Sequence, residues 1–212
     1  MNIVLLIIIV ITCVTSYIGF QNPELFQKYK FEVGAIQRKK EYIRLLSAGF
    51  LHADFMHLLF NMYTLYVFSS IAFIGFGVGG FLAIYLGSIV LGNLFCLYVY
   101  KNVPFYSAIG ASGGVSGILF AAVALAPNEI KIWFMPGFLF GALYFGYSVY
   151  MMLNPRAHDN IGHAAHLGGA FFGLVYAVAI YPEFAMQNAV YLGVMALPLI
   201  YLAYQLFVNK KI

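Results

Sequence analysis

Long apolar stretches, separated by short polar ones, make up most of this chain. They cover residues 3–20, 55–76, 81–100, 113–126, 132–153, 164–180 and 190–208. An α-helix needs about 20 mainly apolar residues to cross the roughly 30 Å hydrocarbon core of a bilayer. All stretches except the fourth come close to that length. The pattern therefore predicts seven transmembrane helices in an all-α, polytopic membrane bundle.

The fourth stretch is too short to span a bilayer. It stops at Pro127 and reaches only about 20 Å as a helix. We expect this helix to begin below the membrane surface, with residues 105–111 dipping into the protein, where protein or water can satisfy their backbone groups. Gly79 and Gly80 predict the turn between the second and third stretches.

Residues 21–54 form the one long polar connection. Basic, acidic and aromatic side chains alternate in it, which is typical of a folded segment lying on the membrane rather than of a linker. The other polar segments are a loop over residues 154–160 and a tail ending in Lys210 and Lys211. The first stretch is interpreted as a retained transmembrane helix rather than a signal peptide, because no basic region precedes it.

Composition agrees with a membrane location. The 212 residues are 63% hydrophobic and only 8% charged, whereas soluble domains carry roughly 25% charged residues. The net charge of +4 is small and the basic residues lie near the ends of the stretches, so we expect no nucleic-acid partner. Cys13 and Cys96 fall inside apolar stretches and are interpreted as packing residues, without a disulfide framework.

Polar residues inside the stretches indicate where chemistry could occur, because they are costly in a membrane. All seven acidic residues lie in loops or at stretch ends, which disfavours an ion-coupled transporter. His57 and Asn61 are four residues apart and share one helical face. Without a carboxylate in helical reach or a His-Glu-x-x-His pattern, we expect no metal. An intramembrane histidine can also serve simply to join helices.

Two glycine-rich segments stand out from the apolar background. Residues 110–117 place Ser112 at the start of the fourth stretch, and residues 162–169 place His166 at the start of the sixth. Gly113 with Gly117, and Gly169 with Gly173, have the spacing of closely packed membrane helices. Packing these faces together is predicted to bring Ser112 close to His166, and a serine needs such a base to become a nucleophile.

The three polar motifs together resemble those of the rhomboid intramembrane serine proteases. The motifs are His52-x4-His57-x3-Asn61, Gly110-Ala111-Ser112-Gly113 and Ala165-His166-Leu167-Gly168-Gly169. The resemblance implies a six-helix protease core over residues 1–181, including an interfacial first loop over residues 21–54. Residues 182–212 would add one transmembrane helix and a short basic tail.

The resemblance also implies a role for each motif residue. Ser112 would be the nucleophile and His166 its general base, acting as a dyad without a cofactor. His57, Asn61 and the Ser112 backbone N–H would form the oxyanion hole. The remaining family positions, taken as structural or supporting, are His52, Gly110, Gly113 and Gly169. The alternatives Ser116 and His163 match the family pattern less well.

One position departs from the family pattern. Many rhomboids carry an aromatic residue four positions after the nucleophile, stacked on the catalytic histidine, where this chain has Ser116. Another group, or nothing, must then orient the His166 ring.

The implied substrates are transmembrane segments of other proteins, reached within the lipid bilayer through a gate at the fifth helix. The expected location is the cell membrane, with the active-site side outside the cytoplasm. The basic residues argue for the opposite orientation, since only Lys131 of the eleven falls on the other side. An inactive rhomboid-like protein that binds client helices, or a small-molecule transporter, is the alternative function.

Overall fold

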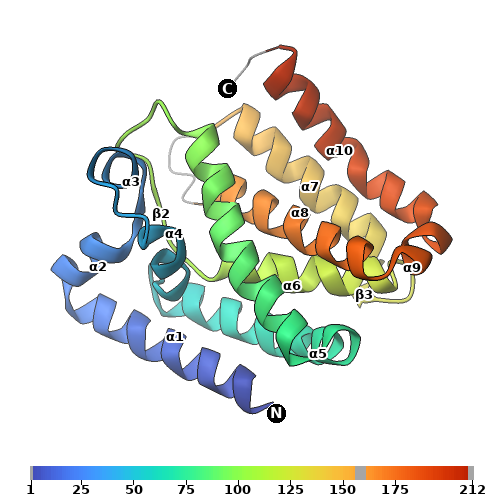
Figure 1. The fold of residues 1–212 in the computed structure, drawn as a ribbon, viewed down its shortest axis with the longest axis horizontal. Helices are drawn as coiled ribbons and strands as arrows, with labels where there is room; N and C mark the ends of the chain where they lie inside the picture. The colour runs from blue at the N-terminus through green and yellow to red at the C-terminus, as the bar shows by residue number, and fades with distance from the viewer. Residues whose placement is uncertain (1, 156–160, 210–212) are drawn as a thin grey trace.

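Six long helices carry the apolar stretches in the computed structural model, which describes residues 2–155 and 161–209 (Figure 1). They are α1 (Ile3–Gln21), α5 (Phe55–Val99), α6 (Ser112–Leu125), α7 (Gly137–Leu153), α8 (His163–Ile180) and α10 (Ala189–Phe207). Four of them, α1, α5, α8 and α10, are long and apolar enough to cross a membrane by length and composition. The chain is an integral, multi-pass membrane protein with an all-α bundle fold.

The second and third predicted helices form one element, α5, with a sharp bend (Figure 1). The bend lies at Gly77, with φ 66° and ψ −175°, and not at Gly79 and Gly80 as the sequence suggested. Glycine adopts this conformation without the steric cost that a Cβ would bring. The second half of α5 runs back through the bundle toward the first loop.

Helix α6 occupies the centre of the bundle, between α5 and α8. Its residues from Gly113 to Ala124 are all buried, which explains why a short helix is tolerated here. Glycines allow its backbone to touch that of α8. A Cβ placed at Gly169 would collide with the Gly113 carbonyl, and one at Gly173 with the Gly117 carbonyl. The predicted small-residue packing is thereby confirmed.

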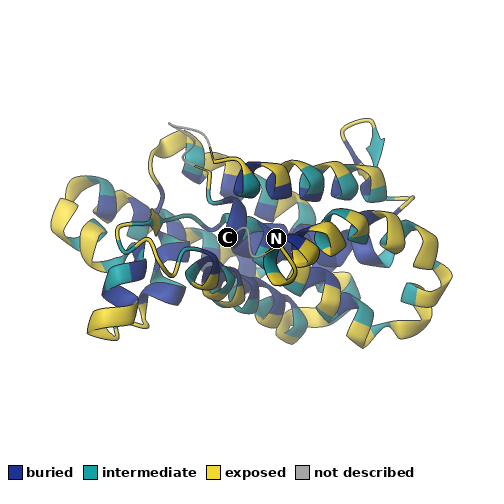
Figure 2. Cartoon of the chain, turned by 90° about the horizontal axis from the view of Figure 1, so that it is seen from above, coloured by how far each residue is buried: buried dark blue, intermediate teal, exposed yellow. Residues whose placement is uncertain are grey.

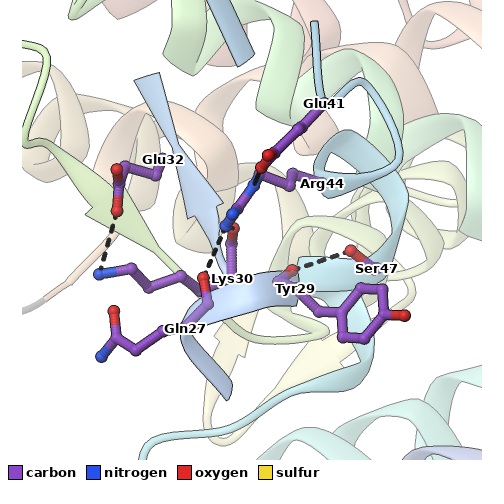
Figure 3. A network of polar contacts seen from close by, with 7 residues as sticks. All are labelled: Gln27, Tyr29, Lys30, Glu32, Glu41, Arg44 and Ser47. Atoms are coloured by element: carbon purple, nitrogen blue, oxygen red, sulfur yellow. Dashed lines mark hydrogen bonds and ion pairs between the residues drawn. The ribbon is translucent and has the colours of Figure 1, made fainter. Parts of the chain in front are cut away.

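The long polar connection is folded, as predicted. It contains α2 (Pro23–Tyr29), β1 (Phe31–Glu32), α3 (Val33–Lys39), α4 (Arg44–Ser47) and the 3₁₀ turn η1 (Ala48–Phe50). Buried Arg44 joins them, donating to the Glu41 carboxylate at 2.6 Å and to the carbonyls of Gln27 at 2.7 Å and Lys30 at 2.8 Å (Figure 3). These charge-assisted bonds fix α2 against α4.

The first loop also pairs with the segment that leads into α6. Strand β1 lies antiparallel to β2 (Ser107–Ala108), with Phe31 opposite Ala108. The predicted dip of residues 105–111 into the protein is confirmed only for its second half. Phe105 is 90% exposed, whereas Ala111 is completely buried. The backbone of this segment is thus held by protein, as a non-helical segment in a membrane requires.

The fifth apolar stretch begins differently from the prediction. Residues 131–136 form a small hairpin of β3 (Lys131–Ile132) and β4 (Met135–Pro136), and α7 starts only at Gly137. Trp133 takes a positive φ of 57° in the turn, and Pro136 lacks the N–H that a helix interior needs. Helix α7 packs mainly on α10, and α9 (Pro182–Gln187) joins α8 to α10.

Exposed residues lie mostly along the outward faces of the peripheral helices, while the centre is buried (Figure 2). Large apolar side chains dominate these faces on α1, α5 and α10, for example Ile7, Phe60 and Leu197. This is the arrangement of a bundle whose outer surface contacts lipid. The predicted polar loop residues 156–160 and the basic pair Lys210–Lys211 lie outside the described residues.

Candidate active site

Ser112 and His166 meet at the beginnings of two adjoining helices. Ser112 is the first residue of α6, and His166 lies in the first turn of α8. The Ser112 Oγ and the His166 Nε2 are 2.5 Å apart. This approach depends on the backbone contact between Gly113 and Gly169 immediately beyond them. A hydroxyl beside an imidazole in this way can lose its proton to the ring.

Gly110 brings a third side chain to the pair. It has φ +121°, and a Cβ there would lie 2.8 Å from the Cε1 and Nε2 atoms of His57 and 3.5 Å from Ser112 Oγ. Only a residue without a side chain fits between the His57 ring and the serine. The Gly110 N–H donates to the Ala48 carbonyl at 3.0 Å, which ties this peptide to the first loop.

His52 holds the peptide that precedes Ser112. The Ala111 N–H donates to His52 Nε2 at 3.2 Å, so the ring proton must reside on Nδ1. That Nδ1–H donates to Ser16 Oγ at 2.9 Å, and the Ser16 hydroxyl donates to the Phe50 carbonyl at 3.0 Å. A hydrogen-bonded chain therefore runs from α1 through His52 to the start of α6.

His52 is neutral in this arrangement. Burial lowers the pKa of its imidazole to about 3; His57 contributes in the same direction, while the Asp54 carboxylate acts weakly against it. A charged ring would have to donate from both nitrogens, which would break the bond accepted from Ala111. The fold thus selects the neutral form of His52.

His57 presents a hydrogen-bond donor toward Ser112, whereas Asn61 does not reach it. Asp54 caps α5 by accepting from the His57 N–H at 2.8 Å. The Ala53 N–H makes a long bond of 3.4 Å to His57 Nδ1, which leaves the ring hydrogen on Nε2, the atom facing Gly110. The Asn61 amide donates to the His57 carbonyl of its own helix at 2.9 Å. Within the described ranges, no hydrogen bond joins Asn61 to Ser112 or His166.

Ser116 is bonded to a residue that sequence reasoning missed. Its Oγ lies 2.9 Å from the Tyr144 Oη of α7. The Tyr144 ring packs against Phe120 of α6, with the ring centroids 5.2 Å apart. The sequence carries no signal for this pair, because tyrosines occur throughout the apolar stretches. His163, the alternative histidine, is buried with its ring edge-on to Tyr147 at 5.5 Å.

A cleft of about 660 Å³ opens beside His57 on the side of the first loop. Its lining combines the first loop, the segment before α6 and the ends of α7 and α8, including Lys30, Tyr106, Ile109, Met151, Pro155 and Gly162. Burial raises the pKa of Tyr106 well above its usual range, and its ring stacks on Tyr100 at 3.7 Å. No group of three potential metal ligands occurs in the part of the chain that the structure describes.

Fold and site together define a multi-pass membrane protein with a serine–histidine pair set inside its helix bundle. The Rhomboid domain model matches residues 39–183, more than half of the chain. The chain belongs to the rhomboid family.

Several curated proteins resemble this chain over its central part. It is 35% identical over 144 residues to the mitochondrial presenilin-associated rhomboid-like protein of Mus musculus, covering 62% of this chain and 36% of that protein. Rhomboid protein 1, mitochondrial, of Saccharomyces cerevisiae is 28% identical over 143 residues, covering 63% and 40%. Rhomboid protease GluP of Bacillus subtilis is 28% identical over 168 residues, covering 76% and 31%. The chain thus matches about a third of the length of these relatives.

Proposed function

We propose that this chain is an intramembrane serine endopeptidase that hydrolyses peptide bonds in or near transmembrane segments of membrane proteins. The observation that carries the proposal is the 2.5 Å contact between Ser112 Oγ and His166 Nε2 at the adjoining starts of α6 and α8. Membership of the rhomboid family, which includes intramembrane serine proteases, supports the same assignment.

In the proposed mechanism, Ser112 Oγ attacks the carbonyl carbon of the scissile peptide bond. His166 Nε2 takes the hydroxyl proton and later returns it to the leaving amine. A water molecule then repeats the sequence on the acyl-enzyme and frees the carboxylate. Nε2 must be unprotonated at rest, so the ring hydrogen of His166 resides on Nδ1 before attack.

The oxyanion would accept hydrogen bonds from the Ser112 backbone N–H and from His57 Nε2–H. Both lie beside the nucleophile, the second across the space kept open by Gly110. Asn61 would join them only if its amide turned away from the His57 carbonyl. One such donor is worth roughly 2.7–4 kcal/mol in a soluble serine protease.

Substrate and water would reach this site from different directions. The cleft of about 660 Å³ beside His57 would provide a route for water from the side of the first loop. Helix α7 packs mostly on α10 and less on α8 and α6, so its displacement would open a lateral path for a substrate helix. A substrate segment with helix-breaking residues would unwind most readily into the cleft.

The test is cleavage of a generic transmembrane substrate in liposomes by the purified protein, compared with Ser112→Ala. We expect cleavage by the wild type alone, and labelling of Ser112 by a fluorophosphonate probe. A folded wild-type protein that neither cleaves nor reacts with the probe would instead be a rhomboid-like protein that binds client helices.

We propose that the chain lies in the cell membrane; one of its relatives, rhomboid protease GluP, comes from a bacterium, Bacillus subtilis. The names of the other two relatives make a mitochondrial membrane the competing location. Membrane fractionation of cells expressing the native chain distinguishes the two.

A further inference from the structure

A second cavity lies on the outer side of the bundle, away from Ser112. It is a groove of about 620 Å³ between the second half of α5, α8 and α10, and is called the α5–α10 groove here. Its walls include Leu91, Phe95, Phe171, Ala203 and Leu206. Every side chain that lines it is apolar, apart from the hydroxyl of Tyr98. Its volume falls within the roughly 300–1,000 Å³ typical of ligand sites.

The groove exists because α10 leans on α7 rather than on α5. Met195 of α10 fills the space over Gly141 of α7, and Pro198 faces Gly146. The rings of Phe138 and Tyr191 add a contact, with centroids 4.8 Å apart. The other face of α10 lies opposite α5 and α8 across the groove, which Leu199, Ala203 and Leu206 line from this side. Lipid is the only solvent available to such a surface in a membrane.

The depth of the groove fits a lipid chain better than a helix. Its lining runs from Leu91 to Tyr98 on α5 and from Leu199 to Phe207 on α10. At 1.5 Å per residue these spans are about 10–12 Å, less than one leaflet of a roughly 30 Å core. A spanning helix about 10 Å wide and 30 Å long would occupy roughly 2,400 Å³, several times the volume of the groove.

A positive charge stands at the end of the groove nearest the first loop. The Lys101 ammonium lies 4.8 Å from the ring centroid of Tyr98, itself a lining residue. The carbonyl of Lys101 accepts from the Gln37 side chain at 3.2 Å, which places the exposed Arg38 and Lys39 of α3 on the same side. Three of the four acids of the first loop are engaged elsewhere: Glu32 pairs with Lys30, Glu41 pairs with Arg44, and Asp54 accepts from the His57 N–H.

We propose that the α5–α10 groove binds an anionic phospholipid, with one acyl chain between the helices and the phosphate against Lys101. An acyl chain gains little from leaving bulk lipid for an apolar groove, because both surroundings are equally apolar. Selectivity must therefore come from the cation at the rim. One lysine near a membrane surface contributes about 1 kcal/mol toward an anionic lipid, or about fivefold in affinity.

The test measures retained lipid and is independent of proteolysis. The full chain is reconstituted in vesicles of equal parts phosphatidylglycerol and phosphatidylcholine, extracted gently and analysed by native mass spectrometry. We expect the chain to retain one phosphatidylglycerol in preference to phosphatidylcholine. Lys101→Gln should reduce its retention about fivefold, whereas Lys101→Arg and the matched control Lys131→Gln, a charge on the opposite side, should retain it.

Filling the groove should have a stronger effect than removing the charge. Ala203→Trp places a large side chain in the groove and should abolish retention of the lipid. Leu197→Trp, on the exposed face of the same helix and outside the groove, should leave retention unchanged. Ala203→Leu serves as a second variant if the tryptophan prevents folding.

Several results would overturn the proposal. Equal retention of phosphatidylcholine and phosphatidylglycerol by the wild type would show that the groove does not select an anionic headgroup. Unchanged retention of the lipid by Ala203→Trp would show that the lipid does not bind in the groove. A folded Ala203→Trp variant that keeps its lipid but changes its oligomeric state, or its KM for a transmembrane substrate, would assign the groove to a protein helix.

Discussion

The hydroxyl groups of Ser116 and Tyr144 are 2.9 Å apart and join α6 to α7 one helical turn below Ser112. Ser116 is buried, and the stacked rings of Phe120 and Phe145 add a further contact between these two helices. At the position where many rhomboids carry an aromatic ring on α6, this chain thus has a serine that binds an aromatic residue from α7. The bond couples the helix that bears the nucleophile to the helix that we expect to move.

Tyr144→Phe removes only this hydrogen bond and should weaken the attachment of α7. We expect a loss of about 0.5–1.5 kcal/mol in the free energy of unfolding, the usual contribution of one hydrogen bond. Substrate access should become easier, so KM should fall or stay unchanged while kcat changes little. Thermal unfolding in detergent and steady-state cleavage measure the two effects.

Ser116→Ala is the matched partner of that variant. Because both substitutions remove the same bond, their effects on unfolding should not add in the double variant. Additive effects would contradict the coupling of α6 to α7 through this pair. Ser116→Phe should instead cost roughly 1–3 kcal/mol by overpacking against Tyr144 and Phe120.

The nucleophile assignment is tested by comparing the two serines of the glycine-rich segment. Ser112→Ala and His166→Ala should each abolish cleavage, because only this serine lies within hydrogen-bonding distance of the imidazole. Ser116→Ala should keep most of the activity. If Ser116→Ala were inactive and Ser112→Ala active, the nucleophile would be Ser116 and not Ser112.

His57 and Asn61 should differ in their effects on turnover. His57 Nε2 faces Gly110 and the serine, whereas Asn61 donates to a carbonyl of its own helix. His57→Ala should lower kcat about ten- to a thousandfold with a smaller change in KM, and Asn61→Ala should lower it less. Single-turnover cleavage by both variants and the double variant provides the comparison. Full activity in the double variant would exclude these side chains from the oxyanion hole.

The closeness of Ser112 and His166 was predictable from the sequence, because glycine spacing determines how closely α6 and α8 approach. Gly113, Gly117, Gly169 and Gly173 lie four apart on facing surfaces, and Ser112 and His166 precede them. Tyr144 was not predictable, because its place depends on how α7 is rotated by its packing on α10. The orientation of the Asn61 amide likewise depends on local bonding that the motif does not contain.

The fold was predictable in its helices but not in its turns. The segment around Gly77, Gly79 and Gly80 has three glycines in four residues, and composition alone does not determine which one takes the positive φ. The hairpin before α7 is built from an apolar sequence and places Trp133 at a positive φ, which hydrophobicity cannot indicate. Two of the three bonds of Arg44 in the first loop go to backbone carbonyls, which no side-chain pattern reveals.

His52 should make stability depend on pH. Its pKa is about 3 in the folded protein, against 6.5 for the free side chain, so the unfolded chain binds more protons between these values. Stability from this group is therefore fully present above pH 6.5 and is lost as the pH falls toward 3. By pH 5 the loss should be about 1–2 kcal/mol, before most carboxyl groups titrate.

The variant His52→Gln separates this effect from other titrations, since glutamine can still accept from the Ala111 N–H but does not ionise. Unfolding temperatures measured between pH 7 and pH 5 should fall more steeply for the wild type than for the variant. Parallel curves would show that His52 does not determine acid sensitivity.

The contact between α6 and α8 is tested most directly at Gly169. A Cβ at this position would collide with the backbone carbonyl of Gly113, and neither helix can yield without separating Ser112 from His166. Gly169→Ala should therefore destabilise the protein and reduce kcat, because small misplacements of reacting groups are costly to rate.

Gly193→Ala on α10 is the control, because a Cβ there meets nothing within 4 Å. The control should be neutral or slightly more stable, as alanine favours a helix by up to about 1 kcal/mol over glycine. Equal stability and activity in the two variants would show that the backbone contact does not hold the serine and the histidine together.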